Sequence, residues 1–146
     1  MPEVRRRDGG IRMEDRKVVE TLFIRRAIEV TTEDIDDILC GSLEGGSTFW
    51  CDSVEVVGSY LGEYASEQIS RGGKLRFHVY EPFDDENTEW YELDQEKFLH
   101  GLQEWLNNYA YVDNCLSDGQ LDCGMIDAGM ADSIIQYALF DEEIFG

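Results

Sequence analysis

Apolar residues recur along the chain with two different periods, and the period at each point predicts the element that forms there. The run KVVETLFIRRAIEV, residues 17–30, is rich in β-branched residues and alternates with a period of two. Alternation of this kind is typical of a half-buried β-strand. We therefore expect a first strand over residues 17–30, with Arg26 as its one discordant member. The apolar side of the pattern consists of Leu22, Ile24, Ile28 and Val30.

The two segments that follow have the spacing of amphipathic helices. Thr31 or Thr32 supplies an N-cap for a first helix that ends at Gly45-Gly46. Asp52 followed by Glu55 resembles a capping box, which predicts a second helix closed by Gly72-Gly73. Gly58 and Gly62 lie four residues apart within this second segment, so we expect a smooth stripe that lets another backbone approach closely. The apolar positions of the two segments are Ile35, Ile38 and Leu39, and Val54, Val57, Leu61, Ala65 and Ile69.

The period changes back to two in KLRFHVYE and in TEWYEL, which predicts an antiparallel hairpin. Core residues can share one face only if the paired residue numbers sum to an even value, and a sum near 170 fits the loop. The core pairs predicted by this register are Val79 with Tyr91 and Phe77 with Leu93. The outer pairs are Tyr80 with Trp90, His78 with Glu92 and Arg76 with Asp94.

Two more helices complete the pattern, one capped by Asp94 and one that starts near Asp127. The element order predicts an α+β fold, with a small, mostly antiparallel three-stranded sheet packed by about four helices. At 146 residues the chain fits one domain with a real core. We expect residues 1–16 to be a flexible basic leader and residues 17–146 a single acidic domain.

Charge is distributed unevenly along the chain. Residues 1–26 hold eight basic and five acidic side chains, a net +3, whereas the remaining 120 residues hold four basic and 27 acidic ones, a net −23. A body with this charge presents a negative potential on most faces and repels nucleic acid and anionic membranes. We therefore expect neither as a direct partner. The charge is compatible with a protein that binds the same partners as nucleic acid does.

The four cysteines are Cys40, Cys51, Cys115 and Cys123, and no secretory signal precedes them. This combination predicts reduced thiols in a cytosolic protein. No stretch approaches the roughly 18 apolar residues of a membrane span. The cysteine spacings lack the C-x-x-C of a zinc site, and no acidic segment has the spacing of an EF-hand loop, so we expect no metal and no cofactor.

Catalytic motifs are missing from the sequence. It contains no G-x-S-x-G, no phosphate-binding glycine loop and no H-E-x-x-H, and only two histidines, His78 and His100. With 32 acids in the chain, some carboxylates will lie close together by chance, so their abundance does not indicate a glycosidase. We expect no enzymatic activity.

The segment EPFDDENTEWYELDQE, residues 81–96, carries eight carboxylates, three aromatics and no Lys or Arg. Such a segment fits either a well-solvated hairpin or a surface that imitates the phosphates of nucleic acid. The aromatics favour the second interpretation, because exposed aromatic side chains are common anchors at protein interfaces.

Two further blocks are EDIDDILCGSLEGGSTFWCDSVEVVGSYLGEYASEQISRGG, residues 33–73, and IDAGMADSIIQYALFDEEIFG, residues 126–146. Both resemble small acidic proteins of phages and mobile elements of Gram-positive gut bacteria. Proteins of this size and charge from such elements include anti-CRISPR inhibitors, several of which mimic nucleic acid. The resemblance implies an inhibitor and transfers no catalytic residue.

The leading hypothesis is a non-enzymatic, phage-type inhibitor that binds a basic surface of a host defence nuclease in the host cytosol. The residues expected to supply the charge are Glu81, Asp84, Asp85, Glu86 and Glu89, with Phe83 and Trp90 as anchors. One alternative is a module that sequesters a nucleotide signal between helices, in a pocket formed by Gly58, Gly62, Arg71, Lys74 and Arg76. Another is a homo-oligomeric accessory protein whose Gly58/Gly62 stripe is a subunit contact.

Overall fold

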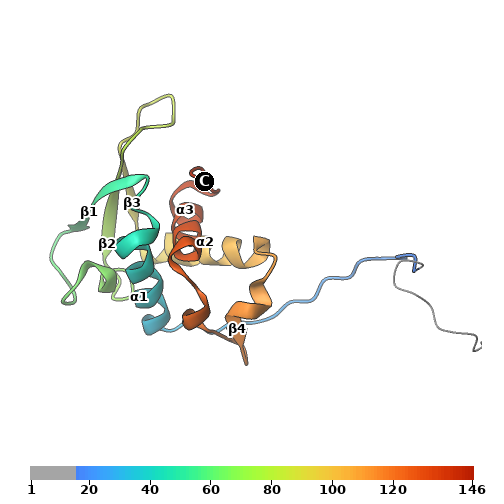
Figure 1. The fold of residues 1–146 in the computed structure, drawn as a ribbon. Helices are drawn as coiled ribbons and strands as arrows, with labels where there is room; N and C mark the ends of the chain where they lie inside the picture. The colour runs from blue at the N-terminus through green and yellow to red at the C-terminus, as the bar shows by residue number, and fades with distance from the viewer. Residues whose placement is uncertain (1–15) are drawn as a thin grey trace, which may run out of the picture.

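The computed structural model of the protein describes residues 16–146. They form an α+β fold in which helices cover one face of a three-stranded antiparallel sheet (Figure 1). The strands, in the order β1-β2-β3, are Cys51–Val57, Lys74–Val79 and Trp90–Leu93. The α-helices are α1 (Thr32–Gly41), α2 (Gln95–Asn108) and α3 (Ala128–Phe140). A small second sheet pairs β4 (Leu116–Ser117) with β5 (Gln120–Leu121). The predicted leader lies almost wholly outside the described residues.

Local sequence signals account for all three helix starts. Thr31 and Asp34 form a capping box at α1, in which each side chain accepts a hydrogen bond from the other residue's backbone N–H. Asp94 caps α2 by accepting from the backbone N–H of Lys97, at 2.8 Å. Asp127 caps α3 in the same way through Met130. The predicted helix starts at Thr31, Asp94 and Asp127 are therefore confirmed.

The sheet buries one face and leaves the other open. Leu75, Phe77 and Val79 of β2 are fully buried against the helices, whereas the residues between them point away from the core. The observed pairs, Phe77 with Tyr91 and Leu75 with Leu93, sum to 168. The predicted assignment of faces is right and the predicted register of 170 is wrong. The last hydrogen bond between the two strands runs from the Val79 N–H to the Glu89 carbonyl. The β2–β3 loop is therefore longer than expected.

The helix predicted over residues 52–72 does not form. Residues 51–57 are strand β1 instead, followed by a loop and one 3-10 turn, Ala65–Glu67, so the described residues contain three α-helices rather than about four. Val54 and Val56 face the core opposite Phe77 and Leu75. Pairing with β2 satisfies the backbone and suits β-branched residues, and this outweighs the helical spacing. Gly58, with a φ of +81°, ends the strand.

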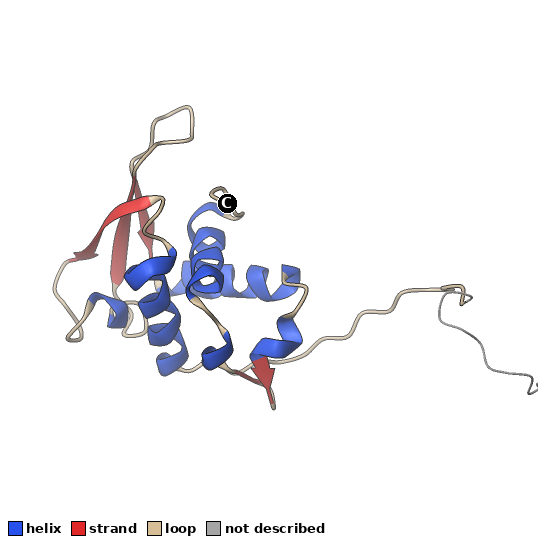
Figure 2. Cartoon of the chain, viewed as in Figure 1, coloured by secondary structure: helices blue, strands red, loops and turns tan. Residues whose placement is uncertain are grey.

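The strand predicted over residues 17–30 is also wrong. The segment is an extended loop (Figure 2). Within residues 16–146 it has no neighbouring strand, and its one ladder contact there is a parallel bridge between Glu29 and Gln120. The first strand of the three-stranded sheet is β1, which the sequence pattern assigned to a helix. An alternating pattern predicts an extended backbone, but a sheet also needs a partner strand, and none lies beside residues 17–28.

A buried polar network joins the first half of the fold to the last helix. The Asp132 carboxylate of α3 accepts hydrogen bonds from Ser47 Oγ at 2.7 Å, Trp50 Nε1 at 2.6 Å and Gln136 Nε2 at 2.7 Å. Gln136 Oε1 in turn accepts from the backbone N–H groups of Ile144 and Phe145. Phe145 stacks on Trp50, with ring centroids 5.3 Å apart. The network therefore fixes the segment after α3 against the core.

Candidate functional site

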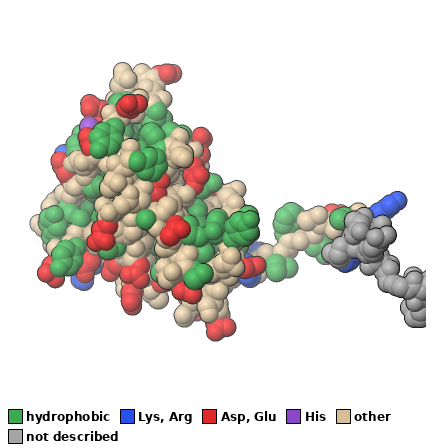
Figure 3. All heavy atoms as spheres, in the orientation of Figure 1, with side chains coloured by type: hydrophobic (Ala, Val, Ile, Leu, Met, Phe, Trp, Pro, Cys, Tyr) green, Lys and Arg blue, Asp and Glu red, His purple; other side chains and the backbone are tan. Residues whose placement is uncertain are grey.

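The open side of the three-stranded sheet, together with the β2–β3 loop, forms a surface that we call the acidic face. Strand pairing places Glu55, Arg76 and Glu92 side by side across it. A second row consists of Ser53, His78 and Trp90, with Asp52 at a bulge in β1. The carboxylates of the acidic face are Asp52, Glu55, Glu81, Asp85, Glu86, Glu89 and Glu92. Carboxylates are also scattered over the face of the body seen in Figure 3, where Lys and Arg side chains are few.

Every cation on the acidic face is held by a carboxylate. Arg76 donates from Nε and Nη2 to Glu55 Oε2, at 2.9 and 2.6 Å, and its guanidinium lies 4.2 Å from the Trp90 ring centroid. Lys74 lies 3.4 Å from Glu92. The two cations therefore neutralise only part of the negative charge, and the face stays acidic.

His78 is bound at both ring nitrogens. Nδ1 lies 2.6 Å from Asp52 Oδ1, and Nε2 lies 3.2 Å from Glu89 Oε1, while the ring packs against Trp90. The predicted partner Glu92 faces Arg76 instead. A histidine acting as a general base needs a free nitrogen for the proton of its nucleophile. With both nitrogens engaged by carboxylates, this site favours an electrostatic clamp between strands over a catalytic dyad.

The two carboxylates raise the pKa of His78 above its ordinary value, because both hydrogen-bond to the ring. Stability contributed by a group with a raised pKa is complete below the unfolded value, about 6.5, and is lost as pH rises through the folded value. To isolate His78, both proteins compared carry His100→Asn. We expect the protein that retains His78 to lose more stability between about pH 6 and pH 9 than the one that also carries His78→Asn. Urea unfolding at the two pH values measures this difference. An equal loss in both proteins would contradict the clamp.

The β2–β3 loop is organised by one of its own acids. The Asp84 carboxylate accepts from the Thr88 backbone N–H at 2.7 Å and from Thr88 Oγ1 at 2.5 Å, and these hydrogen bonds lower the pKa of Asp84. Glu89 is engaged with His78. Within residues 16–146, Glu81, Asp85 and Glu86 make no side-chain ion pair. Of the five acids predicted to carry the charge, these three are the ones free to meet a partner.

The two predicted anchors lie in different surroundings. Phe83 is 40% exposed, but its ring stacks on Tyr91 at 5.8 Å and meets the edges of Phe140 and Phe145. It therefore serves to hold the loop against the segment after α3. Trp90 is half-buried between Arg76 and His78 on the acidic face. Its position on the outer face agrees with the alternation of TEWYEL.

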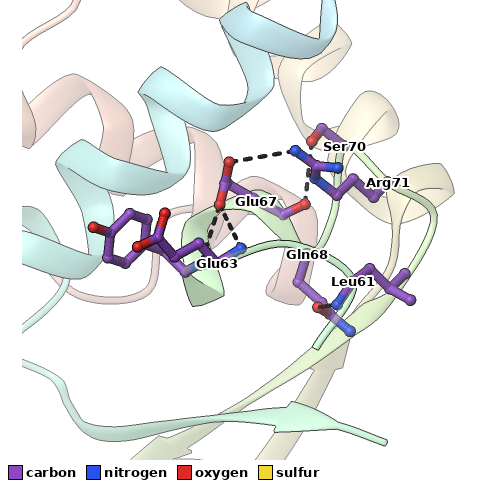
Figure 4. Close-up of polar contacts among 7 residues, drawn as sticks. Leu61, Glu63, Glu67, Gln68, Ser70 and Arg71 are labelled. Carbon is purple, nitrogen blue, oxygen red and sulfur yellow. Dashed lines mark hydrogen bonds and ion pairs between the residues drawn. The ribbon is translucent and has the colours of Figure 1, made fainter. Parts of the chain in front are cut away.

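The loop between β1 and β2 presents another set of apolar side chains. Glu67 Oε1 accepts from the backbone N–H groups of Glu63 and Tyr64, at 2.9 and 3.0 Å, which lowers the Glu67 pKa. The buried Gln68 side chain accepts from the Leu61 N–H at 3.1 Å (Figure 4). It also donates to the Ser59 carbonyl at 3.1 Å. These contacts hold the backbone of residues 59–64 in place. Tyr60, Leu61 and Tyr64 project from it and are 61%, 48% and 62% exposed.

The sequence pattern did not reveal this apolar loop. Residues 59–64 lie within the segment assigned to a helix, where Leu61 belonged to the buried stripe. The signal that could have found the loop is the dipeptide Gly58-Ser59 after the β-branched run Val54 to Val57, which is typical of the end of a strand.

The five residues of the alternative hypothesis, a nucleotide pocket between helices, do not lie on helices. Gly58 and Gly62 lie in the β1–β2 loop, so they form no helical stripe. Arg71 lies 3.4 Å from Glu67, and Lys74 and Arg76 pair with Glu92 and Glu55 across the sheet. An anionic nucleotide would have to displace a carboxylate at each cation. The Gly58/Gly62 subunit contact, conceived as a helix stripe, loses its structural basis for the same reason.

Other chemistry has little support among residues 16–146. No group of His, Cys, Asp and Glu side chains there is arranged to hold a metal ion. All four cysteines are free thiols, and burial together with Asp34 raises the pKa of Cys123 to about 12. None of the helices in this part of the chain is long and apolar enough to cross a bilayer.

Comparison of the chain with protein-family models, with curated proteins and with solved structures finds no significant match.

Proposed function

We propose that this protein is a non-enzymatic inhibitor that binds a basic, nucleic-acid-binding surface of another protein through its acidic face. The observation that carries the proposal is the excess of carboxylates on an open sheet face whose cations are already neutralised. Glu81, Asp85 and Glu86 extend this charge onto the β2–β3 loop, where no side-chain ion pair within residues 16–146 engages them. An array of this kind attracts the Arg- and Lys-rich channels that hold nucleic acid.

The target class that this surface suits best is a nuclease of a host defence system, of the kind that anti-CRISPR proteins inhibit. Such enzymes bind nucleic acid through lined-up cations, and a rigid acidic protein competes for the same cations. Inhibition by occupation requires no chemistry in the inhibitor. The blocked nitrogens of His78 are consistent with that mode of action.

Aromatic contacts at one end of the face would add to the electrostatic attraction. The pairing of Val57 with Lys74 places the Tyr60-Leu61-Tyr64 loop at one end of the sheet, and the β2–β3 loop lies at the other. The six residues of β2 separate the two loops by about 20 Å. Exposed, preorganised tyrosines lose little conformational entropy on binding and are frequent interface anchors.

The test begins with affinity capture on the immobilised protein at low and at high salt, followed by DNA-binding competition with each purified nuclease recovered. We expect the variant Glu81→Gln/Asp85→Asn/Glu86→Gln to compete about tenfold more weakly, at about 0.5 kcal/mol for each exposed charge, and with a smaller salt dependence. Asp84 and Glu89 are left in place because they organise the loop and hold His78.

The matched control is Glu33→Gln/Asp37→Asn/Glu44→Gln, which removes the same charge from exposed positions on and just after α1. It should compete nearly as well as the wild type. If both variants competed equally weakly, net charge alone would determine binding. This would contradict the assignment of binding to the acidic face. Recovery of proteins that do not bind nucleic acid would contradict the target class.

A further inference from the structure

Residues 17–24 extend away from the body as an apolar arm (Figures 1 and 3). The large apolar side chains of the arm are between 82% and 97% exposed, and they are Val18, Val19, Leu22, Phe23 and Ile24. They include even and odd positions, so both faces of the extended segment are apolar. A strand that is apolar on both faces is typical of one buried on both sides.

The arm leaves the body beside an open groove. The Arg26 guanidinium lies 2.8 Å from Asp113, and Glu29 N–H donates to the Gly119 carbonyl at 2.8 Å, so the chain is fixed from residue 26 onward. Along α2, next to this point, runs a groove of about 420 Å³. Its apolar lining from the body consists of Ile28, Val30, Leu99, Leu102, Leu106, Val112 and Leu116. Arg26, Gln103 and Asn107 are its polar residues, and the last residue of the arm, Ile24, also borders it.

The charge of the arm indicates which kind of partner it can bind. Lys17, Arg25 and Arg26 against Glu20 give residues 17–26 a net charge of +2, whereas residues 27–146 carry four basic and 27 acidic groups. A basic partner attracted by the acidic face would repel the arm. A groove lined mostly by apolar residues on a strongly acidic protein would attract it, and the groove along α2 is of this kind.

We propose that two copies of the chain associate by exchanging arms, each arm lying in the α2 groove of the other copy. The exchange is reciprocal, so each copy contributes one arm and one groove, and the two contacts close around a twofold axis. Val18, Val19, Leu22 and Phe23 of the arm then gain the apolar neighbours that they lack among residues 16–146. This inference is independent of the proposed inhibition.

Light scattering coupled to size exclusion tests the association on the full chain at about 100 µM, where a reversible dimer is populated. We expect a mass of twice 16.8 kDa for the wild type. The arm variant Leu22→Asp/Phe23→Asp should weaken self-association at least about tenfold, because it places charges in a buried apolar contact. Both positions are exposed in the single chain, so its fold should be retained. Circular dichroism checks this.

The matched control, Tyr60→Asp/Leu61→Asp, makes a comparable change at an exposed apolar pair outside the arm, and it should remain dimeric. A groove variant, Leu99→Asp, should be monomeric alone. Mixed with the arm variant it should form a heterodimer, because one intact arm then meets one intact groove. A monomeric wild type, an arm variant that dimerises normally, or no heterodimer in the mixture would each overturn arm exchange.

Discussion

Replacing Asp132 with alanine is expected to destabilise the fold by about 3–5 kcal/mol. The substitution leaves the buried N–H groups that Trp50 and Gln136 donate to Asp132 without an acceptor, whereas the Ser47 hydroxyl can still donate to Ser42 Oγ. Each buried donor left unsatisfied costs about 1–3 kcal/mol, and the release of a desolvated carboxylate offsets part of the sum. Urea unfolding followed by circular dichroism measures the change, and a loss below about 1 kcal/mol would show that the network contributes little.

Asp132→Asn is the informative control. The amide oxygen can still accept from Ser47 and Trp50, but the amide nitrogen would face the donor Nε2 of Gln136. Gln136 cannot reverse its own amide without losing the bonds to the Ile144 and Phe145 N–H groups. We therefore expect a smaller loss, about 1–3 kcal/mol.

The wild type and the Asp132→Asn variant should also differ in how their stability depends on pH. Burial raises the pKa of Asp132, although hydrogen bonds from Trp50, Ser47 and Gln136 oppose the shift. When the pKa of a carboxyl group is higher in the folded state, the free energy of unfolding increases as pH falls from the folded-state pKa towards the unfolded-state pKa. The stability of the wild type relative to Asp132→Asn should therefore increase on acidification through this range.

The second large effect is expected at the crossing of α2 and α3. Gly101 is buried where the helices touch, and a Cβ there would overlap the backbone N and Cα of Ala138. Overpacking of this kind costs about 1–3 kcal/mol, even though alanine favours the helical backbone by up to about 1 kcal/mol. We expect Gly101→Ala to lower the free energy of unfolding by about 1–2 kcal/mol, measured by urea denaturation.

Gly129→Ala provides the contrast. Gly129 is an exposed residue in the first turn of α3, and the nearest atom to its added Cβ would be Asp127 Oδ1 at an ordinary contact distance of 3.5 Å. This variant should be as stable as the wild type or more stable by up to about 1 kcal/mol. If Gly101→Ala behaved in the same way, the close approach of the two helices would be contradicted.

Local signals in the sequence predicted the parts of the fold that depend on neighbouring residues. Capping by Thr31, Asp94 and Asp127 acts over three residues, and it located all three helices. The alternation in β2 and β3 assigned the correct faces of both strands. The exact register was beyond reach because it depends on the loop, whose Phe83 is held by Phe140 and Phe145 far along the chain.

The failures come from tertiary pairing. Val54 and Val57 fit a helical stripe as well as a strand, and only the presence of β2 beside them decides the outcome. Residues 17–24 have the pattern of a strand, but the described part of the chain offers them no partner strand. At the acidic face, the sequence predicted the carboxylates of the β2–β3 loop. It did not reveal that Glu55 and Glu92 neutralise Arg76 and Lys74, or that Tyr60 and Tyr64 are exposed.

The network around Asp132 also bears on how the chain reaches its fold during synthesis. Its bonds to Trp50 and Ser47 span 82 and 85 positions. Contacts of such large sequence separation slow folding, because a long loop must close before they form. On the ribosome, α1 and the three-stranded sheet are made well before α3, so Trp50 waits without an acceptor and the core face of the sheet stays uncovered. We expect the core to close in one late step, once residue 145 has been added, and the nascent chain to depend on chaperones until then.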